Sequence, residues 1–278
     1  MKQYYIICDV SLCHDCNNCF IACKDEHVGN CWLPYTDAQP RHGHRWMNIL
    51  RLERGQSPRV DVSYLPLPCQ HCADALCVKL HPDCVSRRED GIVLIDAEKA
   101  KGNKILADSC PYDAIYWNEE AGVAQKCTMC AHLLDGESWD TKVPRCVHSC
   151  PTGALEFYQI EPGEMERKIK DEELECFRPE LNGGMAGVYY RNIYRFTKLF
   201  ISGGLLKGGE CAEGVMVTIS GAEPATCEVM HSQLTSCFGD FKFDGLEPGG
   251  YLISVEGEDL RSVTISESLN LGSIVINS

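Results

Sequence analysis

The pattern of apolar and polar positions changes at about residue 201. Beyond that point, short segments alternate apolar and polar residues with a period of two, which is typical of half-buried strands. Glycine and proline separate the segments, as in the predicted turns at Gly239–Asp240 and Leu246–Gly250. The predicted strands are Val215–Ile219, Phe241–Phe243, Tyr251–Val255, Ser262–Ile265 and Ser273–Ile276. This spacing predicts an all-β sandwich over residues 201–278.

The first part of the chain has a different pattern. Residues 1–160 contain short apolar runs, prolines and loops with little long periodicity, beginning with a predicted strand at about Tyr4–Ile7. The charged segment Glu161–Glu175 predicts a short helix that begins near Pro162 and turns its charges to solvent. We interpret residues 179–200, with their aromatic run, as a connector that lies over another surface.

The chain has 19 cysteines, and most of them are grouped. The first run is Cys13-x2-Cys16-x2-Cys19-x3-Cys23. The other groups are Cys69-x2-Cys72-x4-Cys77, a lone Cys110 before Pro111, Cys127-x2-Cys130, and Cys146-x3-Cys150 before Pro151. Grouped cysteines favour metal ligation over a disulfide framework, and they favour a reducing or anaerobic compartment. The spacing is best explained by three [4Fe-4S] clusters, which transfer single electrons.

Composition narrows the function further. The 278 residues carry a formal net charge of −14 and include 44% hydrophobic residues. Nucleic acid is a poor partner for such a chain, because phosphate binding needs a basic surface. No segment has the apolar length of a membrane helix, and no signal peptide or twin-arginine pair is evident. We therefore expect a cytoplasmic protein, with co-export on a partner as the alternative.

The cysteine region repeats internally. Cys110–Ile115 and Cys150–Leu155 both begin with Cys-Pro and continue through a predicted tight turn into an apolar strand. This is the form of a bacterial ferredoxin module. In two-cluster ferredoxins, the fourth cysteine of one run ligates the cluster of the other run.

Applied here, that crossing rule predicts three ligand sets. They are Cys13, Cys16, Cys19 and Cys150 for the first cluster; Cys23, Cys127, Cys130 and Cys146 for the second; and Cys69, Cys72, Cys77 and Cys110 for the third. The middle module, about residues 60–120, is then an insertion between two halves of the first. A fourth cluster is lost, because Ala100, Asn103, Leu106 and either Leu80 or His81 stand where its cysteines would be.

Alternatives remain at several positions. Zinc is an alternative for the C-x2-C groups, most of all for Cys127/Cys130 with Cys146/Cys150. Cys84 is an alternative to Cys110, and His81 is a further candidate ligand. We interpret Cys8 and Cys31 as thiols without a cluster, and Cys211, Cys227 and Cys237 as small buried hydrophobic residues.

Two lysines adjoin ligands of the second set. Lys24 follows Cys23, and Lys126 precedes Cys127. A nearby cation favours the more negative, reduced cluster, so this cluster is a candidate for a raised potential. The alternative is that both lysines are solvated at the surface.

The order of the cysteine runs resembles that of the iron–sulfur β subunits of molybdopterin oxidoreductases related to dimethyl sulfoxide reductase. The missing third run and the appended sandwich resemble a narrower group in that family, the small subunits of pyrogallol–phloroglucinol transhydroxylases. The segments that carry the likeness are Cys13–Cys19, His44–Ile49, Arg88–Asp96 and Val123–Asp135. The segment Gly239–Tyr251 resembles prealbumin-like or Cna-B-type sandwiches, which usually serve as interaction or spacer modules.

This resemblance implies a heterodimer with a large catalytic subunit that binds molybdenum through two pterin guanine dinucleotides. It implies anaerobic transfer of a hydroxyl group between carbons of a polyhydroxylated aromatic ring, with the clusters priming or poising the metal. A reductive catechol-type dehydroxylase, another molybdopterin reductase, a free-standing polyferredoxin and a zinc scaffold are the alternatives. The lone chain is expected to have no catalytic residues of its own.

The expected fold class is α+β: tandem ferredoxin-like modules over 1–160, a helix and connector over 161–200, and the all-β sandwich over 201–278.

Overall fold

A computed structural model describes residues 1–222 and 229–276. The chain divides into two compact units. The N-terminal unit comprises residues 1–50 and 64–193, and the C-terminal unit comprises residues 51–63 and 194–278. The predicted position Cys227 lies outside the described residues.

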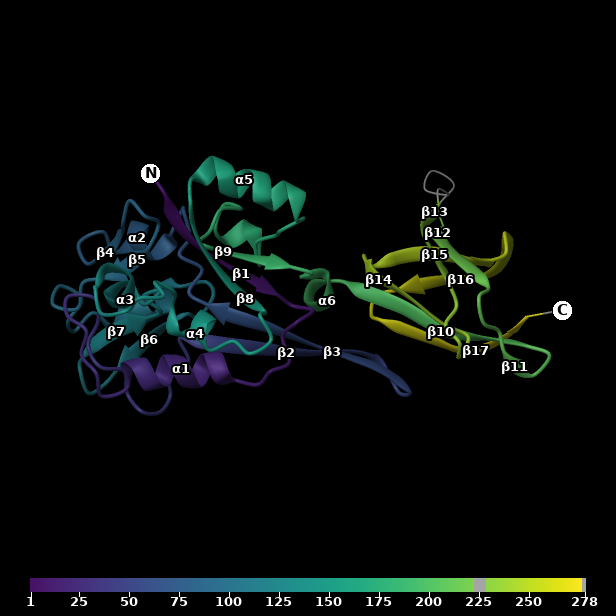
Figure 1. The fold of residues 1–278 in the computed structure, drawn as a ribbon, viewed down its shortest axis with the longest axis horizontal. Coiled ribbons are helices and arrows are strands. Elements are labelled where there is room, and N and C mark those ends of the chain that lie inside the picture. The colour runs from purple at the N-terminus through teal and green to yellow at the C-terminus, as the bar shows by residue number, and fades with distance from the viewer. Residues whose placement is uncertain (223–228, 277–278) are drawn as a thin grey trace. The chain divides into compact units, whose positions relative to one another are not determined.

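A three-stranded sheet runs through the N-terminal unit, in the order β8-β1-β9 (Figure 1). Strand β1 (Gln3–Asp9) pairs antiparallel with β8 (Leu155–Ile160) and parallel with β9 (Val188–Arg191). Helix α5 (Pro162–Asp171) buries Met165 against the sheet and exposes most of its charged residues. Both the first strand and the helix beginning at Pro162 are thus confirmed.

The interpretation of residues 179–200 as a surface connector was wrong for β9. Val188 and Tyr190 are fully buried, and Tyr189 is nearly so. Their backbone pairs with Ile6–Asp9, so this segment is a strand of the sheet. The apolar and aromatic run has only four paired residues, which is too short for its periodicity to separate a strand from a connector.

The rest of the N-terminal unit consists of short elements around small hydrophobic cores. Two hairpins pair β4 (Val85–Arg87) with β5 (Val93–Ile95) and β6 (Ile115–Asn118) with β7 (Val123–Lys126). The helices are α1 (Asn18–His27), α2 (Leu76–Leu80), α3 (Ala131–Asp135) and α4 (Arg145–His148), with 3-10 turns η1 (Lys104–Ser109) and η2 (Pro179–Leu181). No helix in the described residues is both long and apolar enough to cross a membrane.

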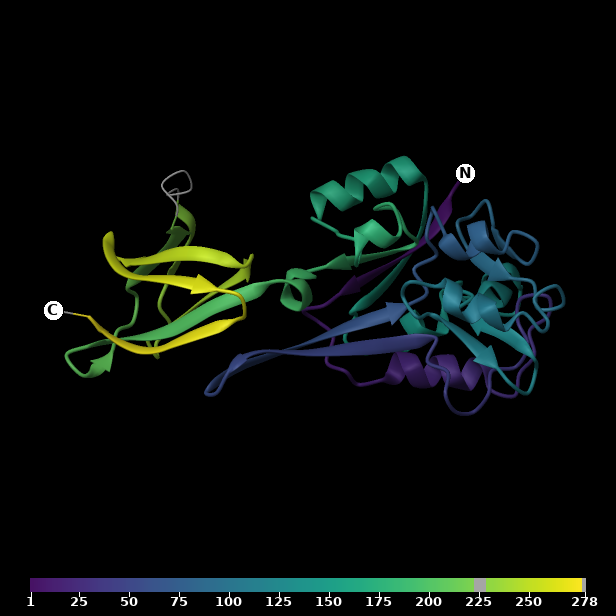
Figure 2. The ribbon, with the colours of Figure 1, turned by 180° about the vertical axis from the view of Figure 1, so that it is seen from behind.

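Two four-stranded sheets form the C-terminal unit (Figures 1 and 2). One places β10 (Leu199–Lys207) between β14 (Asp240–Leu246) and both β11 (Glu210–Cys211) and β17 (Leu269–Ile276). The other has the order β13 (Val229–Leu234), β12 (Met216–Gly221), β15 (Gly249–Val255), β16 (Glu258–Ile265). One core joins them, because Ile201 and Phe241 of the first sheet cluster with Ile219 and Ile253 of the second. A four-residue helix, α6 (Tyr194–Thr197), precedes β10.

The strands predicted by period-two alternation are confirmed as β12, β14, β15, β16 and β17. The turn before β14 requires glycine, because Gly239 has φ of 75° and a Cβ there would lie 2.4 Å from the carbonyl oxygen of Leu205. Burial of Cys211 and Cys237 was wrongly expected. Both are exposed, since Cys211 ends the two-residue strand β11 and Cys237 lies in the loop before β14.

A long hairpin was not predicted. Strand β2 (Met47–Gln56) pairs with β3 (Arg59–Pro68), and residues 51–63 at its tip belong to the C-terminal unit. There, Arg54 donates hydrogen bonds to Asp61 (2.6 Å) and Asp244 (2.9 and 3.0 Å), and its side chain is 4% exposed. Burial opposes ionisation of Asp244, but hydrogen bonds from Arg54 and Lys242 hold its pKa below the usual range.

We expect Arg54→Met to destabilise the C-terminal unit by about 3 kcal/mol, because it leaves two buried carboxylates without their guanidinium partner. Native-state hydrogen exchange of β10 and β14 amides measures the change. Arg59→Met is the matched control, since Arg59 pairs with Asp240 at a surface where both side chains are about 40% exposed. Its loss should cost less than about 1 kcal/mol. Equal effects of the two variants would contradict this account of the hairpin.

Candidate metal centres

The β1–β8 ladder determines the first candidate centre, site 1. Cys8 is paired with Leu155, and the Asp9 amide donates to the carbonyl oxygen of Ala154 at 2.8 Å. The loop that leaves β1 therefore meets the turn that enters β8. This brings Cys13, Cys16 and Cys19 together with Cys150.

The four thiols of site 1 influence one another. Burial raises the pKa of the Cys19 thiol to about 12, and the neighbouring Cys13, Cys150 and Cys16 raise it further, against a hydrogen bond from the Phe20 amide. Cys16 is exposed, while Cys13 and Cys150 are partly buried. Site 1 therefore has one ligand-type side chain at the surface.

Site 2 joins two helices to one loop. Helix α1 carries Cys23, and α4, which contacts α1, carries Cys146 (Figure 1). Burial raises the pKa of the Cys146 thiol well above its usual range, followed by the effects of Cys130, Cys127 and Cys23. The structure thus brings together the four cysteines of the second predicted set.

Helix α1 also links the first two sites. Cys19 and Cys23 are four residues apart and lie on one face of this helix. Cys19 faces the thiols of site 1, whereas Cys23 faces Cys127 and Cys130. A single turn of helix therefore separates thiols that belong to different sites.

Site 3 begins where β3 ends. Cys69 follows Pro68, α2 carries Cys77, and Cys110 precedes the turn into β6. These three and Cys72 line one pocket, and its other walls include Ala75, Leu76, Val93 and Ile115. The predicted ligand set contains only the cysteines, because apolar wall residues leave no spacing signal in a sequence.

The same backbone device recurs in the three C-x2-C loops. The residue directly before the second cysteine has a left-handed conformation in each: Asp15 (φ 54°), His71 (φ 46°) and Met129 (φ 55°). This conformation is rare outside glycine, and it curls the loop tightly between its two thiols. In the third loop, the Met129 amide donates to Cys127 Sγ at 3.4 Å.

The two Cys-Pro turns also correspond. Asp113 (φ 53°) and Gly153 (φ 71°) lie three residues after Cys110 and Cys150, and both turns lead into strands, β6 and β8. The predicted turn-and-strand repeat is therefore present in the backbone.

The two alternative ligands of site 3 lie elsewhere. Cys84 is buried, with Sγ 3.8 Å from the carbonyl oxygen of His81, and is not among the pocket residues. His81 contacts Asn103 at 3.2 Å through Nδ1 and is likewise outside the pocket lining. Of the remaining predicted free thiols, Cys8 is buried beside site 1 and Cys31 is exposed.

The donor set suits an anionic metal cluster. Burial raises the pKa of Cys110 and Cys127 to about 11 and that of Cys130 to about 12, so these thiols are neutral without metal. Cluster binding must displace those protons, which couples assembly to folding. Among the described residues, no three His, Cys, Asp or Glu side chains converge on a position for a single metal ion. Four thiolates around a multi-iron cube are spaced more widely than those around one ion.

The two lysines differ in their surroundings. Lys126 is 3% exposed and lines the site 3 pocket, so a solvated surface position was wrong for this residue. Lys24 is half-buried and donates from Nζ to the carbonyl oxygen of Pro40 at 2.9 Å.

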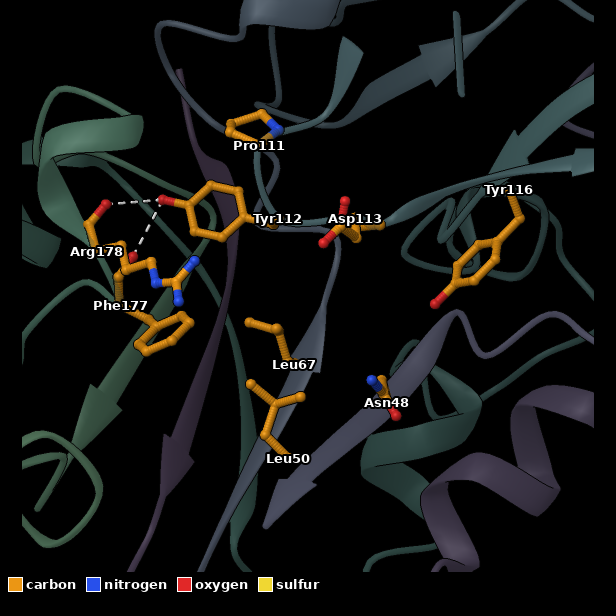
Figure 3. A pocket seen from close by; sticks show the side chains of 10 residues that line it. Asn48, Leu50, Leu67, Pro111, Tyr112, Asp113, Tyr116, Phe177 and Arg178 are labelled. Atoms are coloured by element: carbon orange, nitrogen blue, oxygen red, sulfur yellow. Dashed lines mark hydrogen bonds between the residues drawn. The ribbon is translucent and has the colours of Figure 1, made fainter. Parts of the chain in front are cut away.

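A larger cavity, of about 410 Å³, lies beside the Cys110–Pro111 turn (Figure 3). Its lining includes Tyr112, Tyr116, Phe177 and Arg178 but no cysteine. The Tyr112 hydroxyl is 3.0 Å from the carbonyl oxygens of both Phe177 and Arg178. The cavity is therefore separate from the three cysteine sites.

These sites define an iron–sulfur protein by comparison as well as by geometry. Residues 60–160 match a family model described as a 4Fe-4S dicluster domain.

Curated relatives extend the match across the chain. The pyrogallol hydroxytransferase small subunit of Pelobacter acidigallici is 52% identical over 260 residues, covering 93% of this chain and 92% of that protein. The thiosulfate reductase electron transfer subunit PhsB of Salmonella typhi is 30% identical over 68% of this chain and 93% of its own length. One polypeptide of the anaerobic dimethyl sulfoxide reductase of Escherichia coli is 33% identical over 61% of this chain and 78% of its own length. This chain belongs to the family of iron–sulfur subunits of the molybdopterin oxidoreductases.

Among solved structures, the 5-hydroxyisourate hydrolase of Klebsiella pneumoniae covers 28% of this chain and 90% of its own, at 21% identity and a TM-score of 0.23. This score is too low to assign a fold to any part of the chain.

We expect Cys110→Ser to lower the iron content by about four atoms per chain, because it removes one ligand of one cube. Cys84→Ser is the matched control, and it should leave the iron content unchanged since Cys84 lies outside the pocket. Iron and sulfide analysis of the anaerobically purified chain measures both. Iron loss in the Cys84 variant alone would reverse the assignment.

Proposed function

We propose that this chain is the electron-transfer subunit of a molybdenum enzyme and holds three [4Fe-4S] clusters. The observation that carries this proposal is 52% identity to the pyrogallol hydroxytransferase small subunit over 93% of the chain. The three sets of four cysteines supply its chemistry. The proposed ligands are those of sites 1, 2 and 3, and Cys84 and His81 are not among them.

The order of the sites supports a relay. The Cys23 and Cys146 thiols of site 2 are influenced by Cys19 of site 1, and Cys127 of site 2 by Cys69 of site 3. Site 2 is therefore adjacent to both of the others. The exposed Cys16 makes site 1 the natural point of contact with a partner.

The residues around the thiols have three tasks. Bound clusters supply one-electron transfer. The thiolates hold them, backbone amides such as that of Met129 donate hydrogen bonds to sulfur, and the apolar walls of site 3 exclude water. Hydrogen bonds and burial then set the reduction potentials.

We further propose a large partner subunit that binds molybdenum through two pterin guanine dinucleotides. The proposed reaction is hydroxyl transfer between pyrogallol-type aromatic rings, which is redox-neutral overall. The clusters then prime or poise the metal of the partner. The alternatives are delivery of electrons in every turnover, as in a reductive catechol-type dehydroxylase or another molybdopterin reductase, and service as a free-standing polyferredoxin.

The proposed domain plan is a ferredoxin-like module over 1–160 with the middle module of about 60–120 inserted, followed by a connector and a β-sandwich of the prealbumin or Cna-B type from about residue 201. The sandwich is proposed to be an interaction or spacer module. Its two sheets around a single core support that proposal.

Anaerobic copurification with metal analysis tests the function. We expect a brown complex with a much larger subunit, containing molybdenum and about twelve iron and twelve sulfide per copy of this chain. The complex should convert pyrogallol without consuming a reduced viologen dye. Stoichiometric consumption of the dye would favour the reductive alternative.

The chain purified without the larger subunit is the control, and it should hold clusters but show no turnover. A stable monomer that reduces several unrelated reductases would favour the polyferredoxin. A colourless chain that contains zinc would contradict every electron-transfer function.

A further inference from the structure

Lys126 is a buried cation at the end of β7, between two of the cysteine sites. Its Nζ donates hydrogen bonds to the carbonyl oxygens of Val93 and Cys127, the latter at 3.0 Å. Val93 and Lys126 both line the pocket of site 3, whereas Cys127 belongs to site 2. The positive charge lowers the pKa of both Cys77 and Cys127, after the larger and opposite effect of burial on each.

This ammonium group has no carboxylate partner. Within residues 1–222 and 229–276, the ion pairs include none to Lys126. Carbonyl oxygens satisfy its hydrogen bonds but do not neutralise it. Buried charges are normally paired, because an isolated charge in a low-dielectric interior is costly. The anionic groups beside Lys126 are the thiolates of sites 2 and 3 and the clusters that they hold.

We propose that Lys126 is the shared counter-ion of the clusters at sites 2 and 3 and raises the reduction potential of both. This rests on the proposed function, because it requires both clusters to be present. On reduction, each cluster gains one electron and one unit of negative charge, and no proton moves. A fixed positive charge at short range stabilises the reduced state more than the oxidised state.

Site 1 has a different charge environment. The charged side chain that influences the Cys13 thiol is Asp15, whose carboxylate opposes further negative charge. Arg45 is half-buried nearby and donates to Asn17 Oδ1 at 3.1 Å. An electron is therefore held at sites 2 and 3 in preference to site 1, which suits a chain that keeps spare electrons away from its exposed end.

Reduction potentials test the proposal directly. We would prepare Lys126→Met, Lys126→Gln and Lys126→Arg in the anaerobic complex and titrate each cluster by electron paramagnetic resonance at controlled potential. The Cys110→Ser variant, which lacks the site 3 ligand, assigns the signals. We expect both neutral variants to lower the midpoints of sites 2 and 3 by at least a tenfold change in the reduced-to-oxidised ratio, or about 59 mV for one electron. Lys126→Arg should retain most of the potential, and site 1 should not change.

Two further lysines are matched controls. Lys24→Met should lower the midpoint of site 2 alone, because the Lys24 charge acts on Cys23. Lys170→Met, on the exposed face of α5, should change none of the three.

Iron and sulfide analysis separates failure of this inference from failure of the proposed function. A wild-type chain without clusters would refute the function. Full cluster content with unchanged midpoints in Lys126→Met would refute the inference alone. If the neutral variants lose iron while Lys126→Arg retains it, the counter-ion role is supported. Loss of iron in all three variants would show that side-chain shape, not charge, is required, and would overturn the proposal.

Discussion

Antiparallel pairing of β1 with β8 is the constraint on which the cysteine sites depend. It joins the start of the chain to residues more than 140 positions later, with Cys8 opposite Leu155. The loop after β1 and the turn before β8 then share one end of the ladder, where Cys13 and Cys150 meet. Helix α1 starts from that loop and carries Cys23 toward α4. A register shift in this one ladder would separate the thiols of site 1 and redirect the helix that supplies site 2.

Charge is the second constraint on this unit. Twelve thiols gather in a small region, and burial raises the pKa of nearly all those whose shift is resolved. As ionised ligands they need compensation from iron, from amide N–H groups and from cations. Lys126 supplies the last of these where sites 2 and 3 adjoin. The small hydrophobic cores of the unit cannot provide this compensation, so metal binding and folding are expected to be interdependent.

Cysteine spacing was sufficient to predict which thiols gather, because a crossing rule for ferredoxins converts spacing into contact. Period-two alternation was likewise sufficient for β12 and β14 to β17. Burial of individual residues was not readable in this way. Lys126 looks like any lysine in sequence, and only the hairpin partners of β7 enclose it. Strand β9 was missed because four residues carry no clear period, and Cys211 was misplaced because an edge strand of two residues has no buried face.

The hairpin β2–β3 has the least sequence signal and the widest structural effect. Its strands are longer than any other pair, and its tip supplies Arg54 to Asp61 and Asp244 across 190 positions of sequence. A buried guanidinium with two carboxylates adds little net stability over apolar packing, but its geometry admits few alternative partners. Arg54 therefore specifies which strands the C-terminal unit includes. Because β3 ends at Pro68 and Cys69 follows, the same hairpin begins in the C-terminal unit and ends at the first ligand of site 3. Completion of site 3 and completion of the β-sheet unit thus depend on one continuous pair of strands, which couples the electron-carrying part of the chain to its appended module through covalent structure alone.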